Sequence, residues 1–521
     1  MSQQNKLVRN ISMMSIAVFI SRILGLIRDT VMAYFFGTTY LNDAFIVAYK
    51  IPNLLRLLFG EGALSTAFVP LYNEIGIKKG KESQMQFALQ VLSILCFFLI
   101  ILSLLGILLA PWIVRLLYPG LQPKTMHLAI DLTRIMLPYL FFIGLSSTLI
   151  AILNSHDYFF MTGLSSALLN VGMISTILIP WFIFKPDGVR LIYWAAWGVF
   201  VGGCLQTLVN FPYLKKIGYR FKIILSFKGK ALEAMWKRFI PSMIGIGIRE
   251  INLIADSLMA SFLTVGSITA LEYGNRLMQL PLGIFAISTG TALLPLYSRC
   301  VTKEDYDTLT HSLKFSGISL AYVMIPITML IFLLKQDFVY LIFQRGAFDA
   351  RASLMTQQAL FYYSLGLLFF SLNQTVTPLF YAAKDTKTPV KIAAVMVGLN
   401  IVMNFILMQF IGHRGLALST SITALVNYIV LQWQIRKKLP RVSFSGIWIN
   451  IIKTTLLCAV IYIPLYFWAT NWSVEGKLYT LIKGGVLSLT AFAIFYLLGR
   501  LVRLPYLDEF WQNLWQRFRR A

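Results

Sequence analysis

The fold of this chain is decided by the segment Val18-Phe-Ile-Ser-Arg22-Ile-Leu-Gly-Leu-Ile-Arg28-Asp29. It lies in an apolar run, residues 10–36, that is long enough to cross a bilayer as one helix, since about 20 residues suffice. A second such run, residues 41–75, carries Asp43, Lys50, Arg56 and Glu61. Charges at membrane depth are costly on a lipid-facing surface, so we expect them to face a polar interior and to serve a function.

The composition of the whole chain indicates a membrane protein. Of its 521 residues, 58% are hydrophobic and only 13% are charged, whereas a water-facing surface needs more charge. The four cysteines are scattered through apolar runs, which argues against a disulfide framework or a zinc site. The polar residues 1–10 lead into an apolar run longer than a signal-peptide core, so we expect no cleavable signal. The fold class predicted is an all-α polytopic membrane protein.

Hydropathy and turn residues indicate about fourteen transmembrane helices. We expect them at residues 10–36, 41–75, 86–118, 126–154, 159–184, 190–214, 236–263, 267–297, 312–343, 352–382, 388–411, 415–435, 446–469 and 478–500. The second and eighth spans are too long for one straight crossing and contain proline and glycine. Broken helices at membrane depth line protein or water, and in transporters they mark the binding site.

The distribution of lysine and arginine predicts the orientation. With an even number of spans both termini lie on one side, and the loops of that side hold 28 of the 46 Lys and Arg residues against nine in the opposite loops. The positive-inside rule therefore places both termini in the cytoplasm. The most basic loop, residues 215–238, is expected to touch anionic headgroups as well. Because the charge follows topology, we expect no nucleic-acid binding.

Weak internal repeats suggest two similar halves. Val69-Pro70-Leu-Tyr-Asn recurs as Leu294-Pro295-Leu-Tyr-Ser, and Leu208-Val-Asn210 recurs as Leu425-Val-Asn427. The offset corresponds to six spans, an even number, so the halves would be related by a pseudo-two-fold axis along the membrane normal. We predict an N-lobe of six helices at residues 1–218, a C-lobe of six helices at 219–440, and two extra helices with a cytoplasmic tail at 441–521.

The cations within the predicted spans give the strongest chemical signal. They are Arg22, Arg28, Lys50, Arg56, Arg134, Arg249, Arg276, Lys453 and Lys483. The last two lie near span ends, where a lysine head snorkels to water and gains little from a fixed partner. Several arginines in a membrane suit an anionic ligand with more than one charged group, such as a pyrophosphate, because guanidinium donates bidentately.

Spacing along the helices predicts which charges share a face. Arg22 and Asp29 are seven residues apart, as are Asp43 and Lys50, and seven residues make nearly two helical turns. Glu272 lies four residues before Arg276 and can pair with it directly. An ion pair of Arg22 with Asp29 is the structural alternative to a binding role for Arg22. The turn residues at 156–157 and 384–385 are interpreted as solvated rather than catalytic.

Several motifs resemble the MurJ (MviN) family of lipid II flippases, in the multidrug/oligosaccharidyl-lipid/polysaccharide (MOP) exporter superfamily. They are Ser21-Arg22-Ile-Leu-Gly25-Leu-Ile-Arg28-Asp29, Asn42-Asp43-Ala-Phe, Gly60-Glu61-Gly62-Ala63, Tyr273-Gly-Asn-Arg276-Leu-Met-Gln-Leu-Pro281 and Tyr381-Ala-Ala-Lys384-Asp385-Thr-Lys387-Thr-Pro389. The resemblance assigns substrate binding to Arg22, Arg28, Arg56 and Arg276, with Asp29, Asp43, Lys50 and Glu61 as supporting or gating residues. Some relatives carry acids where this chain has Asn275 and Gln279; Glu272 is expected to substitute, with Gln279 in a supporting role.

The resemblance also implies the activity. Such a protein moves lipid II, the undecaprenyl-pyrophosphate-linked peptidoglycan precursor, from the inner to the outer leaflet of the bacterial cytoplasmic membrane by alternating access. It would serve cell-wall biogenesis and cell shape, bind membrane lipids, and act as a monomer. The last two helices would form a groove for the polyprenyl tail. The alternatives are export of another polyprenyl-linked saccharide and drug/cation antiport, which would require an acidic cavity.

Two further expectations concern catalysis and ions. An enzyme acting on a polyprenyl lipid would need catalytic or metal-binding acids clustered at one membrane face, and a nucleotide-driven pump would need a GxxxxGK[ST] loop; the sequence shows neither. We therefore predict neither an enzyme nor a cofactor.

Some relatives hold a cation on three helices, and the resemblance places a monovalent-cation site, for example for Na⁺, at Asp256, Asn400, Asn404 and Thr420. The amide at Asn404 replaces an acid of some relatives and weakens this prediction.

Overall fold

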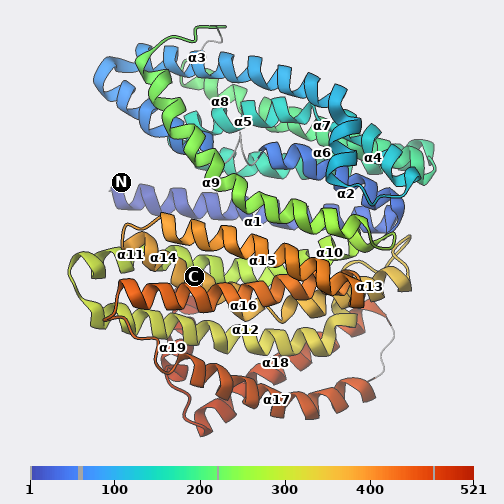
Figure 1. Cartoon of the computed structure of the whole chain (residues 1–521), viewed down its shortest axis with the longest axis vertical. Coiled ribbons are helices and arrows are strands. Elements are labelled where there is room, and N and C mark those ends of the chain that lie inside the picture. The colour runs from blue at the N-terminus through green and yellow to red at the C-terminus, as the bar shows by residue number, and fades with distance from the viewer. Residues whose placement is uncertain (1–2, 57–62, 220–221, 473–475, 521) are drawn as a thin grey trace. The chain divides into compact units, whose positions relative to one another are not determined.

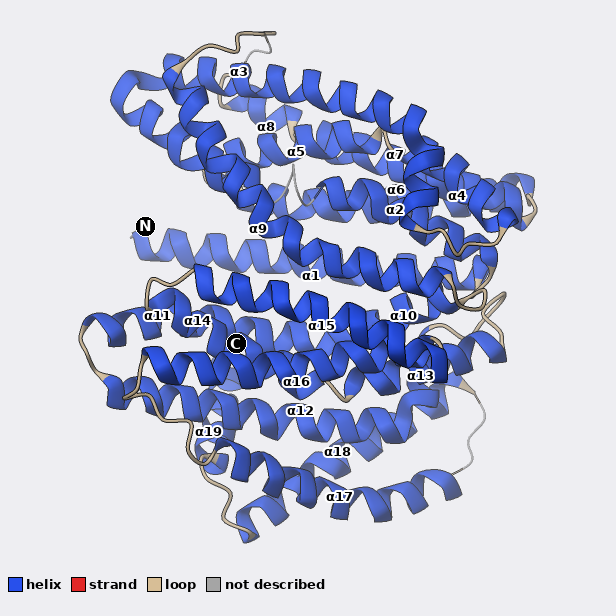
Figure 2. Ribbon diagram, in the orientation of Figure 1, coloured by secondary structure: helices blue, strands red, loops and turns tan. Residues whose placement is uncertain are grey.

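The computed structural model describes residues 3–56, 63–219, 222–472 and 476–520, and these contain helices and no strand (Figure 1, Figure 2). The elements are α1 (Gln3–Phe36), α2 (Tyr40–Arg56), α3 (Ala63–Leu117), α4 (Pro123–Met136), α5 (Tyr139–Asn154), α6 (Phe159–Phe184), α7 (Gly188–Leu208), α8 (Phe211–Lys216), α9 (Lys230–Ser261), α10 (Ser267–Pro281), the π-helix η2 (Leu282–Ile287), α11 (Ser288–Thr302), α12 (Tyr306–Ile342), α13 (Ala350–Ser364), α14 (Leu367–Ala382), α15 (Lys387–Ile411), α16 (His413–Lys438), α17 (Ile447–Asn471), α18 (Lys477–Leu501) and α19 (Leu507–Arg520).

Each predicted span coincides with a helix or with consecutive helices. Nine of the described helices are long and apolar enough to cross a membrane, or ten if the bent pair of α4 and α5 forms one span. The other four predicted spans fall on α1, α2, α9 and the pair α13 and α14. The all-helical membrane fold is therefore confirmed, and the count of fourteen stays a prediction.

The boundary between the second and third predicted spans differs from expectation. We expected a loop near residues 76–85, but α3 runs from Ala63 to Leu117 and is interrupted only at Gly80, where φ is +83°. Glycine adopts positive φ without a steric penalty. One residue therefore changes the direction of the chain here, and the surrounding polar residues remain helical.

Several helix ends follow local sequence rules. The N-cap aspartates Asp187, Asp305 and Asp349 each accept a hydrogen bond from the backbone N–H three residues later. These bonds satisfy one of the unpaired N–H groups with which every helix begins. Helix α6 ends at Phe184. Its C-cap residue Lys185 has left-handed φ, and Pro186 follows, so the helix cannot continue.

The hairpin of α6 and α7 is packed through glycines. A Cβ atom added at Gly172 would lie 2.6 Å from the Gly202 Cα atom, and one added at Gly202 would lie 2.9 Å from the Leu169 Cα atom. Small residues let helix backbones approach closely, which is how helices associate in a membrane without a hydrophobic driving force. The glycine pair therefore fixes where these two helices cross.

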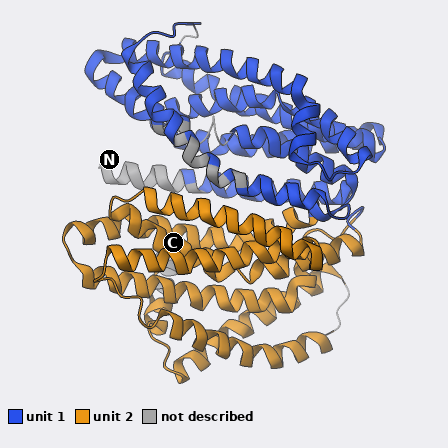
Figure 3. Ribbon diagram, viewed as in Figure 1, with its two compact units in different colours: residues 1–269, 346–348 blue, residues 270–345, 349–521 orange. Residues whose placement is uncertain are grey.

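The chain forms two compact units (Figure 3). Unit 1 comprises residues 1–269 and 346–348, and unit 2 comprises residues 270–345 and 349–521. The lobe boundary predicted from sequence, between residues 218 and 219, is not where these units divide, because α9 packs along α3 inside unit 1. The division into two lobes and a two-helix addition stays a prediction.

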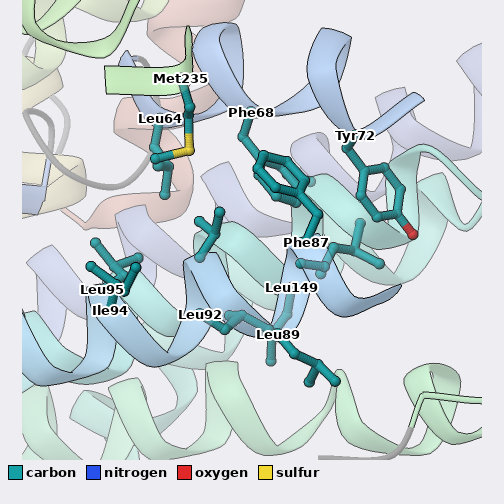
Figure 4. Close-up of a cluster of buried hydrophobic side chains, with 14 of the residues drawn as sticks. Leu64, Phe68, Tyr72, Phe87, Leu89, Leu92, Ile94, Leu95, Leu149 and Met235 are labelled. Atoms are coloured by element: carbon teal, nitrogen blue, oxygen red, sulfur yellow. The ribbon is translucent and has the colours of Figure 1, made fainter. Parts of the chain in front are cut away.

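A buried hydrophobic cluster explains why α9 belongs to unit 1 (Figure 4). The Phe68 ring stacks on Tyr72 and Phe87, with ring centroids 5.2 and 5.7 Å apart. Leu64 of α3 and Met235 of α9 belong to the same cluster and are nearly inaccessible. The packing of these side chains therefore holds the apolar face of α9 against α3.

The eighth predicted span is broken as expected. Helix α10 ends at Pro281, and the next six residues, Leu282–Ile287, form a π-helix before α11 begins. Proline removes a backbone donor and prevents regular α-helical bonding, and π-helical turns are frequent at functional sites. The break lies five residues after Arg276, the predicted binding residue on this span.

Candidate functional site

Two predicted site residues form a buried ion pair on α1. The Arg28 guanidinium donates to Asp29 Oδ1 from Nη2 at 2.7 Å and from Nε at 3.1 Å. Their side chains are only 11% and 10% exposed. Arg22 is exposed and, among the residues that the structure describes, has no hydrogen bond or ion pair. The structural alternative of an Arg22–Asp29 pair is therefore wrong, because the adjacent Arg28 holds the carboxylate.

The carboxylate of Asp43, on α2, caps a different helix. It accepts hydrogen bonds from the backbone N–H groups of Gly266 at 2.6 Å and Thr269 at 2.9 Å, and from the Thr269 hydroxyl at 2.6 Å. Helix α10 begins at Ser267, so the negative charge sits against its unpaired N–H groups and positive dipole end. Asp43 is 4% exposed. A residue predicted to support the cavity thus holds the start of the helix that carries Arg276.

Asp43 and Lys50 both contact the α9–α10 region, as their shared helix face predicts. Lys50 Nζ donates to the Ser257 hydroxyl on α9 at 2.7 Å. Close backbone packing accompanies these bonds: Gly266 has φ of +94°, and a Cβ atom there would collide with the Thr38 carbonyl oxygen. Only glycine fits this position. The turn between α1 and α2 is thus locked onto the loop between α9 and α10.

Removing the Asp43 cap should destabilise the protein. We expect Asp43→Ala to lower the free energy of unfolding by about 2–4 kcal/mol, because it leaves buried N–H groups without an acceptor. Asp43→Asn should cost less, since one acceptor oxygen remains. Unfolding in detergent measures the effect, with Asp131→Ala as control because that carboxylate is 48% exposed. Equal stability of Asp43→Ala and the wild type would contradict the capping role.

Arg56, another predicted residue of the second span, lies at the end of α2. Arg56, half-buried, is the last residue of α2 and donates from Nε to Asn53 Oδ1 at 2.9 Å. Glu61 lies outside the described residues. Arg56 is thus oriented by a neighbour one turn earlier on the same helix.

Helix α10 carries the residues of unit 2 that are predicted to bind the substrate or to support its site. Glu272 and Arg276 are half-buried, and Gln279 is exposed and donates from Nε2 to Asn275 Oδ1 at 3.3 Å. The two amides at the positions where some relatives have acids therefore bond to each other. Pairing of Glu272 with Arg276 and the role of Glu272 as a substitute acid stay predictions.

The residues predicted to bind a cation in unit 2 form a hydrogen-bonded link. Asn400 donates from Nδ2 to the Ser419 hydroxyl at 3.0 Å, and Asn404 donates from Nδ2 to Asn400 Oδ1 at 3.0 Å. Thr420 donates its hydroxyl proton to the Leu416 carbonyl. In this arrangement Asn400 Oδ1 accepts an N–H from Asn404, and the cation site stays a prediction. Asp256, the fourth predicted ligand, is half-buried on α9 in unit 1.

One expectation about lysines is wrong. Lys483 of α18 does not snorkel to water: its side chain is 12% exposed, and Nζ lies 3.6 Å from Asp337 Oδ2 of α12. Asp337, an acid near the end of a long apolar run, is the signal that could have predicted this partner. Lys453 of α17 is exposed, which agrees with the expectation that it snorkels to water.

The Lys483–Asp337 pair should contribute to stability. We expect Lys483→Gln to lower the free energy of unfolding by about 1–3 kcal/mol, because it leaves a largely buried carboxylate without its charged partner. Lys453→Gln is the matched control and should change stability by less than about 0.5 kcal/mol. Unfolding in detergent measures both. Equal tolerance of the two substitutions would restore the snorkelling interpretation.

The turn between α14 and α15 is more structured than expected. The Asp385 carboxylate accepts the backbone N–H groups of Lys387 and Thr388, and the Thr388 hydroxyl at 2.6 Å. Lys438, the last residue of α16, donates to it at 2.6 Å. The hydrogen bond from Lys438, followed by those from Thr388, holds the pKa of the Asp385 carboxyl below its ordinary value. Asp385 therefore forms an ion pair with Lys438 and is fixed by hydrogen bonds at the start of α15.

This pKa shift predicts a pH dependence. The ordinary aspartate pKa is about 3.9, so a depressed pKa stabilises the folded state above that pH, and the contribution is lost as pH falls through the lower folded pKa. We expect Asp385→Asn to unfold at a lower temperature than the wild type at pH 7, with the gap narrowing as pH falls below about 4. A gap independent of pH between 7 and 3 would contradict the assignment.

The sequence matches one protein family over most of its length. The family model described as "Lipid II flippase MurJ" matches residues 32–483. A probable lipid II flippase MurJ of Buchnera aphidicola subsp. Schizaphis graminum is 34% identical over 438 residues, covering 83% of this chain and 84% of that protein. A lipid II flippase MurJ of Burkholderia cenocepacia is 32% identical over 466 residues, covering 88% and 89%.

Solved structures agree with the sequence relatives. The structure described as "Lipid II flippase MurJ, inward closed conformation" has a TM-score of 0.78 at 28% identity and covers 94% of this chain and 99% of that chain. An inward-facing multidrug transporter of the MATE family, in the MOP superfamily, has a TM-score of 0.68 at 15% identity over 84% of this chain and 99% of that chain, and shares the fold alone. The chain belongs to the MurJ family of lipid II flippases.

Proposed function

We propose that this protein moves lipid II from the inner to the outer leaflet of the bacterial cytoplasmic membrane by alternating access. The observation that carries the proposal is family membership over most of the chain: the matched residues 32–483 include Arg56 and Arg276. Lipid II carries an anionic pyrophosphate, so its binding requires cationic groups within the membrane. Helices α1, α2 and α10 carry arginines at membrane-embedded positions.

The guanidinium groups of Arg22, Arg28, Arg56 and Arg276 are proposed to bind the pyrophosphate and nearby acidic groups. The exposed Arg22 supports this, because its charge has no protein partner among the described residues. Guanidinium presents a planar fork that matches phosphate oxygens two at a time. Asp43 and Lys50 would support the site by fixing α2 to α9 and α10, and these bonds would have to loosen if that region moves during transport.

The undecaprenyl tail is proposed to run along α17 and α18 of unit 2. Both helices present large apolar side chains that are more than half exposed: Ile452, Leu456, Val460, Ile463, Leu478, Leu489 and Leu497. Such a surface is stable in lipid and unfavourable in water. A polyprenyl chain lying there would remain in hydrocarbon while the headgroup crosses.

The proposal also covers topology, oligomeric state and energy source. The protein is a multi-pass membrane protein, and we place both termini in the cytoplasm on the charge bias of the loops. We propose a monomer that catalyses no covalent chemistry. Transport would draw on an ion gradient, the membrane potential or consumption of lipid II outside the cell, since the sequence shows no nucleotide-binding loop.

A binding assay with purified protein separates this function from antiport and from export of other saccharides. Lipid II should bind, and an unrelated polyprenyl-linked saccharide should compete only weakly. A cationic drug should not compete, because the membrane-embedded charge of α1, α2 and α10 is basic. Displacement of lipid II by a cationic drug, or equal affinity for unrelated polyprenyl-linked saccharides, would favour the alternatives.

A further inference from the structure

A non-helical segment between α8 and α9 is fixed along α3 inside unit 1. We call residues 222–229 the strap. The Ser93 hydroxyl of α3 accepts the Ile224 backbone N–H at 2.9 Å, and Gln90 Nε2 donates to the carbonyl oxygens of Ser226 at 2.5 Å and Lys228 at 3.0 Å. Side chains of α3 thus satisfy the strap backbone, which therefore has a defined position on this helix.

The strap presents a row of exposed apolar side chains. Ile224 packs against the buried cluster of unit 1, while Ile223, Leu225 and Phe227 are 81%, 52% and 64% exposed. Large apolar side chains in a contiguous exposed row are unfavourable in water and typical of a surface that rests in the membrane interface.

A basic groove lies where the strap meets the start of α9. Its volume is about 650 Å³, and it is lined by Phe227, Lys228, Gly229, Lys230, Leu232, Glu233, Trp236, Lys237 and Ile240. Glu233 pairs with Lys237 at 2.7 Å. The other two lining lysines, Lys228 and Lys230, are not neutralised by an acid of this lining. Tryptophan and lysine together are typical of the headgroup level of a bilayer.

An apolar seam continues from this groove. Leu232 and Trp236 also line a narrow space between α3 and α9, together with Phe98 and Phe239. Phe98 and Ile240 are 45% and 50% exposed. The cationic lining and the apolar surface therefore adjoin, with the polarity order of a phospholipid: charged headgroup first and hydrocarbon next to it.

We propose that this groove binds a phospholipid with an anionic headgroup. Lys228, Lys230 and Lys237 would hold the phosphate and the headgroup charge, and one acyl chain would lie over Trp236 and Ile240. The strap would rest in the same leaflet through its exposed apolar row. This site is separate from the arginines proposed for lipid II, and it would anchor the segment that joins α8 to α9 at the membrane surface.

The test uses the full-length protein in detergent and a photoactivatable phosphatidylglycerol, with phosphatidylcholine of the same chains as the neutral comparison. Phosphatidylglycerol should crosslink within residues 227–240, and phosphatidylcholine should do so at least roughly tenfold less at equal concentration. In K228Q/K230Q/K237Q the affinity for phosphatidylglycerol at this site should fall at least tenfold, since a lysine near an anionic headgroup contributes roughly fivefold. The control K384Q/K387Q/K391Q removes three exposed lysines of unit 2 and should change nothing.

Further measurements control for unfolding and for binding of phosphate alone. Thermal unfolding should be the same for both triple variants, so that lost crosslinking reports lost binding. Trp236→Ala should weaken phosphatidylglycerol binding, and millimolar inorganic phosphate should not displace the lipid, because the acyl chain contributes. Undiminished crosslinking in K228Q/K230Q/K237Q, equal labelling by phosphatidylcholine, or full displacement by phosphate would each overturn the proposal. None of these readouts depends on lipid II transport.

Discussion

Cells that depend on an Arg22→Ala variant should fail to grow, although the variant inserts and accumulates at the wild-type level. The Arg22 side chain is exposed and has no ion pair or hydrogen bond to any described residue, so its removal leaves no protein charge uncompensated. Loss of a charge-assisted contact to the lipid II headgroup should weaken binding by on the order of 2–5 kcal/mol. Complementation of depleted cells, with membrane levels checked by immunoblot, measures the effect.

Arg22→Lys distinguishes bidentate recognition from charge alone. Lysine keeps the charge but is a point donor that cannot fork onto a phosphate, so we expect weak growth or none. The Arg134→Ala variant is the matched control, because that arginine is an exposed membrane-helix residue outside the proposed site, and it should support growth. Healthy growth of Arg22→Ala at normal protein levels would exclude a binding role for this residue.

Asp29→Ala should fail for a different reason, by destabilising the fold. The Asp29 carboxylate accepts two hydrogen bonds from Arg28, and both side chains are about nine-tenths buried. Breaking a buried ion pair by removing one member costs about 3–5 kcal/mol. Unfolding in detergent, or the fraction of protein resistant to protease, should show this loss for Asp29→Ala and not for Arg22→Ala.

The double variant Arg28→Ala/Asp29→Ala separates stability from transport. Removing both charges should restore part of the lost stability, since the Arg28–Asp29 pair is then absent rather than broken. Growth should not return, because Arg28 is also proposed to contact the substrate. Recovery of growth together with stability would show that the pair is structural only, whereas failure to recover stability would show that Asp29 has other partners of equal weight.

The helices were predictable because hydropathy determines them. Runs such as Phe159–Phe184 and Lys387–Ile411 occur at the predicted residues, since an apolar run of this length must satisfy its own backbone in a membrane. The glycine and proline of the eighth span marked a real break at Pro281. The loop expected at residues 76–85 is a kink at Gly80, because a single positive-φ glycine is enough to bend the chain.

Side-chain partners were less predictable than helices. Helix periodicity placed Arg22 and Asp29 on one face, but an adjacent arginine competes for the same carboxylate, and spacing alone does not weigh that competition. The capping of α10 by Asp43 and the pairing of Lys483 with Asp337 join segments more than 140 residues apart. Such contacts depend on how helices pack, which a single sequence does not specify, although a buried acid in an apolar run indicates that a partner exists.

The leaflet accessibility of lipid II in living cells tests the proposed function most directly. Cells depleted of this protein should accumulate lipid II that an externally added, lipid II-cleaving enzyme cannot reach. Expression of the wild type should restore cleavage within minutes, and Arg22→Ala at equal abundance should not. Full external cleavage of lipid II in depleted cells would contradict the conclusion that this protein is the flippase.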